Sequence, residues 1–418
     1  MIAGRRLYRG WFVVSGAFVV LFVAYGAHYS FGVFLSALLD EFHWSRASLA
    51  GVFSIYAVMY PAVGSVAGHL TDRWGPRVVI SGGGVLLGAA LAAMSLVTQL
   101  WQPYLLYGVV AGIGMSAAYV PCNATVVRWF VARRGLAVGL AMSGASAGTF
   151  VMPLVAQLLV ASVGWRVAYV VFGVGIAATL ILVAPLMHRD PESLGLAPDG
   201  GARPLHATRS DPGSWPLSRA IQSRAFWALA ATFGATWVPV FIPLVHLVPF
   251  ARDLGYSPMT AAWVVSSLGA GAVLGRLVMG AVSDRFGRRR TLRVALALQT
   301  VACLGLLTAG GGLLLLLGAS ALFGYGYASV STLFPPLVGD FFGRAHAGSI
   351  VGALFAIAGS TGGIGPWLAG ALYDATGGYT VTWTLCASLN VLALVVFTRA
   401  RPPRERDTFD GACAVKVQ

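Results

Sequence analysis

Charged residues are scarce in this sequence, and lysine is almost absent. Only 10% of the 418 residues are charged, and Lys416 is the single lysine, whereas soluble domains average about 25% charged residues. With 57% apolar residues, the chain lacks the polar groups that would cover a soluble surface. The four cysteines lie in apolar runs or near the C-terminus, so we expect no disulfide. An ordinary soluble fold is therefore excluded.

The sequence also lacks the alternating apolar and polar pattern of a transmembrane barrel. Its apolar runs are continuous, and each is close to the roughly 20 residues that a helix needs to cross a bilayer. Only helices and closed barrels satisfy the backbone polar groups in hydrocarbon. We therefore predict an all-α membrane protein with twelve transmembrane helices. They span 11–36, 48–70, 78–97, 102–125, 136–160, 165–187, 224–250, 258–282, 291–309, 313–338, 346–371 and 379–398.

The basic residues are distributed unevenly along these spans. Of the 28 lysines and arginines, Arg46, Arg166 and Arg252 lie in loops on one side and Arg276 lies inside a span. All the others fall in the termini and in loops on the opposite side. The positive-inside rule then places both termini in the cytoplasm. We expect a multi-pass protein of the cell inner (plasma) membrane, and no nucleic-acid partner, because the positive charges are spread over several loops.

Motifs for enzymatic chemistry are missing as well. The sequence has no nucleophile elbow and no cluster of metal ligands, and the triplet Gly82-Gly83-Gly84 lacks the strand and lysine of a phosphate-binding loop. We therefore expect no catalytic residues, no metal and no cofactor, and a carrier instead of an enzyme.

A proline-rich stretch at 188–223 interrupts the apolar pattern and predicts a cytoplasmic linker. It separates a first group of six spans in residues 1–187 from a second group in residues 224–398. A short cytoplasmic tail, 399–418, follows the last span.

A charged loop motif occurs once in each group of spans. The copies are Gly68-His-Leu-Thr-Asp72-Arg73-Trp-Gly75-Pro-Arg77 and Gly280-Ala-Val-Ser-Asp284-Arg285-Phe-Gly287-Arg-Arg289. An aspartate at the end of a span can pair with an arginine of its own loop or of a neighbouring helix, and release it in another conformation. We therefore predict a role in conformational gating for Asp72, Arg73, Asp284 and Arg285.

Twelve spans, a central linker and this doubled motif resemble the major facilitator superfamily. The resemblance implies two pseudo-symmetric six-helix bundles around a central cavity, with spans 1, 4, 7 and 10 lining it. It also implies alternating access, in which the two bundles rock about the binding site. Within the superfamily, three segments resemble the monocarboxylate transporter and oxalate/formate antiporter group. They are Glu41-Phe-His-Trp44-Ser45-Arg46-Ala47, the segment from Arg128 to Ala141, and Gly275-Arg276 in span 8.

The sequence departs from that group at two positions. Eukaryotic monocarboxylate transporters carry an acidic residue one turn before the span-8 arginine, where this chain has Ala272. Oxalate transporters of the group pair that arginine with a lysine in span 11, and this chain has none there. The proton-coupling residues of those relatives therefore do not carry over, and a dicarboxylate site is disfavoured.

Arg276 carries the strongest signal for a binding site. It lies eight residues before Asp284, so about 12 Å from the end of its span. A cation at that depth costs at least ~2.5 kcal/mol. No acidic residue lies deep in any span, and the nearest candidate is Asp340 at the end of span 10. A substrate carboxylate would neutralise the guanidinium through two parallel hydrogen bonds; the alternative partners are backbone carbonyls, tyrosines and water.

Other polar residues recur at helical spacing in the spans expected to line the cavity. Tyr25 and Tyr29 share a face of span 1 with His28. The predicted substrate-binding residues, besides Arg276, are His28, Tyr119, Asn123, His246 and Tyr327. His28 and His246 are also candidates for proton coupling, because imidazole titrates near neutral pH. The alternative role for all five is hydrogen bonding between helices.

These observations predict a secondary active transporter of small monocarboxylates of the lactate, pyruvate and acetate class, with a proton as co-substrate. We expect a monomer in the lipid bilayer. An organic-anion exchanger of the oxalate/formate type is an alternative, and so is an exporter of larger aromatic acids. From another class, the chain could be a carboxylate-binding membrane sensor, although a tail of 20 residues with no output domain disfavours it.

Overall fold

The computed structural model describes residues 8–131, 133–200, 214–343 and 346–403. The long helices in these ranges are α1 (Gly10–Tyr29), α2 (Phe31–Phe42), α3 (Arg46–Trp74), α4 (Pro76–Ala93), α6 (Gly112–Trp129), α7 (Arg134–Val183), α9 (Arg224–Asp253), α10 (Pro258–Phe286), α11 (Arg288–Leu307), α12 (Leu313–Phe342), α13 (Ala347–Thr376) and α14 (Thr380–Arg399). Shorter helical segments are α5 (Trp101–Pro103), α8 (Leu217–Ala220), η1 (Met94–Leu96), η2 (Tyr104–Ala111), η3 (Ala184–Leu186), η4 (Glu192–Leu194), η5 (Pro198–Gly200) and η6 (Ala309–Gly311).

Eleven helical stretches of the described residues are long and apolar enough to cross a membrane. One of them, Arg134–Leu186, has 53 residues and would measure about 80 Å if it were straight, against about 30 Å of hydrocarbon. The chain turns inside it at Gly164, where φ is 77° and ψ is 161°. This stretch therefore holds the predicted spans 136–160 and 165–187, and the twelve predicted spans are all present. Most boundaries agree to within about one helical turn.

Span 1 is longer than predicted and is interrupted at Ser30. It consists of α1 and α2 and runs to Phe42, beyond the predicted end at residue 36. The Ser30 hydroxyl donates to the Gly26 carbonyl at 2.7 Å, and the backbone N–H of Ser30 donates to the same carbonyl at 3.0 Å, so the side chain adds a local hydrogen bond at the break. The last turn of α2 carries Asp40 and Glu41, whose charges mark the end of the apolar run but not of the helix.

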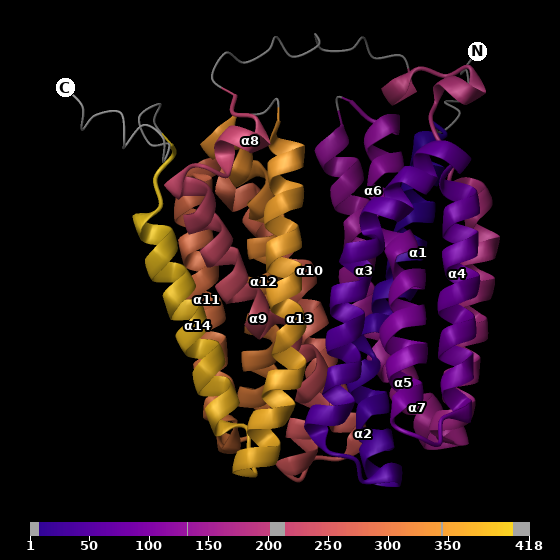
Figure 1. Cartoon of the computed structure of the whole chain (residues 1–418), viewed down its shortest axis with the longest axis vertical. Helices are drawn as coiled ribbons and strands as arrows, with labels where there is room; N and C mark the ends of the chain where they lie inside the picture. The colour runs from indigo at the N-terminus through magenta and orange to yellow at the C-terminus, as the bar shows by residue number, and fades with distance from the viewer. Residues whose placement is uncertain (1–7, 132, 201–213, 344–345, 404–418) are drawn as a thin grey trace, which may run out of the picture.

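The helices form two groups that lie side by side (Figure 1). Helices α1 to α7 pack against one another, and so do α9 to α14; the two groups meet through α3 with α13, α7 with α10, and α2 with α9. We call these groups the N-terminal and C-terminal halves. The start of α1, the end of α14 and the described parts of the central linker lie at the same end of the molecule (Figure 1), which we call the linker end; the other is the far end.

The contact between α3 and α13 covers only part of their length. Near the far end the backbone N–H of Trp367 donates to Ser54 Oγ at 3.0 Å. About halfway along, a Cβ on Gly359 would lie 3.5 Å from the Pro61 ring. Nearer the linker end, a Cβ on Gly352 would have no neighbour within 4 Å. The two helices therefore separate toward the linker end, as the ribbons in Figure 1 also do.

The turn at Gly164 gives a test of the two-span assignment of α7. Its φ and ψ fall in a region that only glycine adopts without strain of about 1–3 kcal/mol. Gly164→Ala should therefore lower the melting temperature of the detergent-solubilised protein by several degrees.

Gly175 is a matched control, because it lies in the same helix and also has no neighbour within 4 Å of a Cβ. Its backbone is helical, so Gly175→Ala should leave the melting temperature unchanged or raise it. Equal melting temperatures for the two variants would contradict a strained turn at Gly164.

Candidate functional site

Arg276 is a cation with no carboxylate partner among the described residues. It lies on α10, ten residues before the helix ends at Phe286, so about 15 Å from the linker end. Its Nε is buried and has no hydrogen-bond partner among the described residues, and none of the ion pairs among those residues includes it. Asp340, named above as the nearest candidate partner, instead pairs with Arg288 at 2.5 Å.

Three tyrosines surround the Arg276 guanidinium. Tyr327, Tyr29 and Tyr119 all lie close enough to interact electrostatically with its charge. The hydroxyls of Tyr29 and Tyr327 are also 3.3 Å apart. Tyr29 and Tyr119 come from α1 and α6 of the N-terminal half, whereas Arg276 and Tyr327 come from the C-terminal half. Neutral hydroxyls can hydrogen-bond a cation but cannot cancel its charge, so this cluster has a net positive charge between the two halves.

Tyr119 connects the cluster to a polar and an aromatic neighbour. Asn123, one helical turn away, lies beside Tyr119, and its Nδ2 donates to the Met142 sulfur at 3.8 Å. The Tyr119 ring lies 6.5 Å from that of Phe355 with 15° between their planes, and Phe355 in turn contacts Trp237 at 5.5 Å. The structure therefore brings together four of the predicted residues, Arg276, Tyr119, Tyr327 and Asn123, and places an aromatic wall beside them.

His28 lies next to this cluster but is enclosed by aromatic rings. It is 1% exposed, and neither ring nitrogen has a hydrogen-bond partner among the described residues. Its ring lies 4.5 Å from that of Tyr29, 4.8 Å from Phe53 and 5.0 Å from Tyr56. This imidazole therefore contacts Tyr29, which in turn lies beside Arg276.

His246 lies apart from the cluster, toward the far end of α9. Its Nε2 is 2.9 Å from the Pro366 carbonyl and its Nδ1 is 2.9 Å from the Tyr379 hydroxyl. Because a carbonyl only accepts, Nε2 carries the hydrogen, and Nδ1 accepts from Tyr379. The structure therefore does not bring His246 together with Arg276.

The two halves are joined by charged residues at the far end. Both Nη atoms of Arg46 donate to the Asp253 carboxylate, at 2.6 and 2.7 Å, and Nη1 also donates to the Tyr379 hydroxyl at 2.9 Å. The Asp374 carboxylate accepts from the backbone N–H groups of Arg46 and Ala47 at 3.1 and 2.9 Å.

A second pair, Arg252 with Asp40 at 2.6 Å, connects α9 to α2 at the same end. At Gly370 the backbones of α13 and α3 come so close that a Cβ would lie 2.7 Å from Ala47. We call the set Asp40, Arg46, Arg252, Asp253, Asp374 and Tyr379 the far-end clasp.

The charged loop motifs at the linker end make contacts within each half. Asp72 accepts a hydrogen bond from Arg128 of α6, a neighbouring helix of the same half, and Arg73 and Arg285 are exposed. The side chain of Asp284 lies outside the described residues. No ion pair at this end joins the two halves among the residues that the structure describes.

The turn that ends each copy of the motif has the same backbone conformation, but the charged residues around it differ. Gly75 and Gly287 end their helices with φ of 84° and 85°, a conformation that favours glycine. Asp340, however, occupies the position equivalent to Arg128, 212 residues later, and pairs with Arg288. The two halves therefore use the same turn with opposite charge at one position.

Comparison with known proteins identifies the family. The model of the Major Facilitator Superfamily matches residues 17–250 and 225–415. Monocarboxylate transporter 11 of Mus musculus is 32% identical over 393 residues, which cover 91% of this chain and 84% of that protein. Monocarboxylate transporter 12 of Xenopus laevis is 29% identical over 399 residues, with 90% and 85% covered. The chain belongs to the monocarboxylate transporter family of the major facilitator superfamily.

A solved structure agrees with the fold. The transporter resembles a bacterial homologue of the human lysosomal transporter Spinster, solved in an inward-facing and unoccupied conformation, with a TM-score of 0.73. The match covers 95% of this chain and 98% of the other at 15% identity. Membership of this family makes the protein a membrane transporter and not an enzyme.

Sequence reasoning missed several residues of the two clusters. Tyr60 of α3 interacts electrostatically with Tyr119 and Tyr327, and the aromatic pair Tyr56 and Tyr60, one turn apart in a predicted span, was the signal for it. Arg46 and Arg252 served only as evidence for topology and, in the case of Arg46, for the family resemblance. Asp253, 207 residues from Arg46 in the chain, gave no local signal of its role.

The far-end clasp gives a second prediction. Asp253→Asn removes the charge that both Nη atoms of Arg46 contact, and the Arg46 side chain is only 16% exposed. A loss of about 1 kcal/mol, or roughly fivefold, should favour states that are open at the far end. A Ser54→Cys reporter on α3, in a background without the native cysteines, should then react roughly fivefold faster with a membrane-impermeant maleimide.

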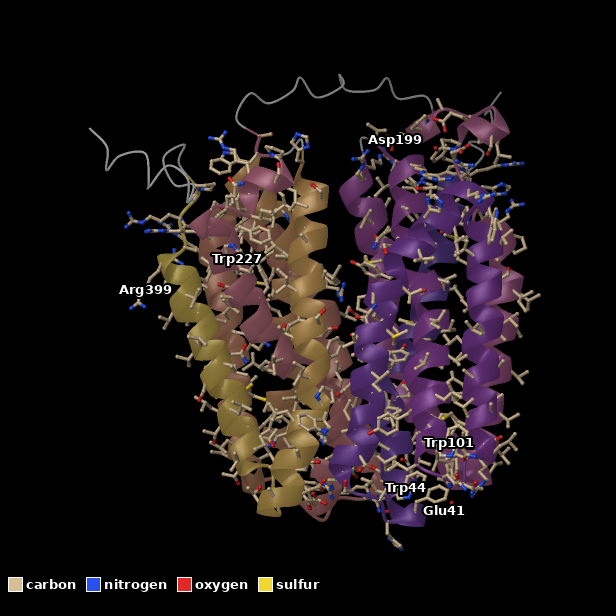
Figure 2. The ribbon with its side chains drawn as sticks, in the orientation of Figure 1. Glu41, Trp44, Trp101, Asp199, Trp227 and Arg399 are labelled. Atoms are coloured by element: carbon tan, nitrogen blue, oxygen red, sulfur yellow. The ribbon has the colours of Figure 1, made fainter. Side chains whose placement is uncertain are left out.

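Glu41→Gln is the matched control for this experiment. Glu41 also lies at the far end (Figure 2), but it pairs with Arg166 of its own half at 2.5 Å. Labelling of the reporter should be unchanged in this variant. An equal increase in both variants would show that general charge loss, and not the clasp, controls access.

Proposed function

We propose that this protein is a secondary active carrier of small monocarboxylates of the lactate, pyruvate and acetate class, with Arg276 as the residue that binds the carboxylate. The observation that supports the proposal is the buried, unpartnered Nε of Arg276 in a cluster that contains no acid. An unpaired cation at this depth is costly. A carboxylate offers the guanidinium two parallel charge-assisted hydrogen bonds, so the empty site selects for an anion.

The tyrosines would add contacts that depend on both halves. Tyr29 and Tyr327 share one hydrogen bond, and each hydroxyl donates only once. One of the two O–H groups therefore stays available for a carboxylate oxygen held by Arg276. Because Tyr29 belongs to the N-terminal half and Arg276 to the C-terminal half, a bound substrate would hold the two halves together. Occupancy would in this way favour the movement that alternating access requires.

The conformation supports exchange of substrate at the linker end. The clasp joins the halves at the far end, and α3 and α13 separate toward the linker end. The excess of arginine at the linker end favours a cytoplasmic location for it in the plasma (inner) membrane. The protein would then face inward, as the related Spinster homologue does in its solved structure.

For proton coupling we propose His28 before His246. His28 has two free ring nitrogens and contacts Tyr29, a neighbour of Arg276. Both nitrogens of His246 are already hydrogen-bonded. The acidic residue used by relatives is replaced by the buried Ala272, so a different titrating group is needed. The gating role of Asp72, Arg73, Asp284 and Arg285 stays part of this proposal, through pairs such as Arg128 with Asp72.

The Arg276 proposal is tested with Arg276→Gln in proteoliposomes. Uptake of labelled lactate driven by an inward proton gradient should fall by roughly 100-fold, equivalent to about 2.7 kcal/mol, because the carboxylate loses its ionic partner. The melting temperature should not fall, because the substitution removes a buried charge that has no carboxylate partner.

Arg276→Lys is the control for charge without the guanidinium fork, and it should retain part of the uptake. A lower melting temperature with undiminished uptake in Arg276→Gln would mean that the arginine is structural. Lactate movement only against a preloaded anion in the unsubstituted protein would favour the exchanger over proton symport.

The proton-coupling proposal is tested with His28→Phe, which fits the aromatic surroundings of this side chain. The variant should no longer accumulate lactate in response to a proton gradient, while exchange of external for internal lactate continues. The readout is the pH dependence of uptake between about pH 5.5 and 8, where histidine titrates. His246→Gln, which can keep both hydrogen bonds, should retain the normal profile; an unchanged profile in His28→Phe excludes His28 as the carrier.

A further inference from the structure

Two basic cavities lie at the linker end of the C-terminal half. One, of about 420 Å³, is lined by Arg288, Arg289, Arg290, Arg293 and Asp340 among others. The other, of about 440 Å³, is lined by Arg224, Arg399 and Arg401. The end of α14 separates them, since Thr398 and Pro402 face the first cavity and Arg399 and Arg401 face the second. Seven arginines and one aspartate therefore surround a single short segment of chain.

Most of these arginines have no acidic partner among the residues that the structure describes. Arg288 pairs with Asp340 and Arg289 donates to the Ala400 carbonyl. None of the ion pairs among the described residues includes the other five arginines. Guanidinium groups bind phosphate oxygens with two hydrogen bonds at a time, so the cavities favour phosphate-bearing ligands over monovalent inorganic anions.

The helices that carry these arginines are apolar on the same face, one turn further into the membrane. The pairs are Arg224 with Trp227 on α9, Arg290 with Val294 on α11, and Arg399 with Val395 on α14. The apolar partners are 52%, 51% and 37% exposed, respectively, and Figure 2 shows Arg399 and Trp227 toward the linker end of this half. Tryptophan is typical of the membrane–water interface. A ligand that matches both the basic cavities and these apolar faces has an anionic head and apolar chains.

We propose that the linker end of the C-terminal half binds an anionic phospholipid with two phosphodiester groups, of the diphosphatidylglycerol type. One phosphate occupies each cavity, and the headgroup spans the end of α14 between them. The acyl chains lie along the exposed apolar faces of α9, α11 and α14. Basic pockets between transmembrane helices are a known mode of binding such headgroups. The lipid fixes the ends of three helices of one half relative to one another.

The proposal is tested by thermal unfolding of the purified full chain in detergent with added lipids. Diphosphatidylglycerol at saturating concentration should raise the melting temperature by about 5 °C. Phosphatidylglycerol, with one phosphate, should have a smaller effect. Phosphatidylcholine and inorganic phosphate should have none, and an equal shift with inorganic phosphate would overturn the lipid as the ligand. This readout needs no transported substrate, so it stands apart from the proposed carboxylate transport.

A set of matched variants identifies the site. R290Q/R399Q/R401Q should lose most of the shift, whereas R290K/R399K/R401K should keep most of it because the charge remains. R9Q/R133Q/R189Q removes the same charge from exposed positions of the N-terminal half and the linker and should keep the full shift. A full shift in the first variant, or an equal loss in the last, would overturn the site. R399Q alone, on the exposed end of α14, repeats the test if the triple variant is not folded.

Discussion

The proposed binding site depends on one cation that lies inside the membrane with no anion beside it among the described residues. Every ion pair among the described residues lies near one of the two ends of the bundle, so the charge of Arg276 is met only by tyrosine hydroxyls. Low dielectric strengthens this unbalanced charge instead of screening it. Under the proposed function, this unbalanced charge would supply much of the free energy that binds a carboxylate.

The two ends of the bundle use the same types of charged residue in different ways. At the far end, arginine and aspartate bind across the halves, and Arg46 alone contacts groups from α9, α13 and the loop before α14. At the linker end, Asp72 and Asp340 bind within their own halves. Similar charges therefore fasten one end and leave the other free to separate. A chain built from two similar halves becomes asymmetric along the membrane normal through its ion pairs.

Much of this could be predicted from the sequence, and the reason is physical. A transmembrane helix is specified by a local run of apolar residues, so the spans were predictable, as was the cost of Arg276 within one of them. The far-end clasp was not predictable, because Arg46 and Asp253 each look like an ordinary charge at a helix end and meet only through packing of distant segments. The enclosure of His28 by rings from α3 and α9 was hidden for the same reason. Likewise, no local pattern shows that Asp340 binds Arg288 and not Arg276.

Gly370 shows how narrowly the resting conformation is set. Its backbone packs against Ala47 without room for a methyl group, so any larger side chain would act as a wedge between α13 and α3 at the point where Asp374 caps α3. A substitution at this one position would therefore shift the equilibrium between conformations that are closed and open at the far end. A larger residue at position 370 would in this way separate the two halves at the far end, and it offers protein engineers a means to bias the conformation of the molecule.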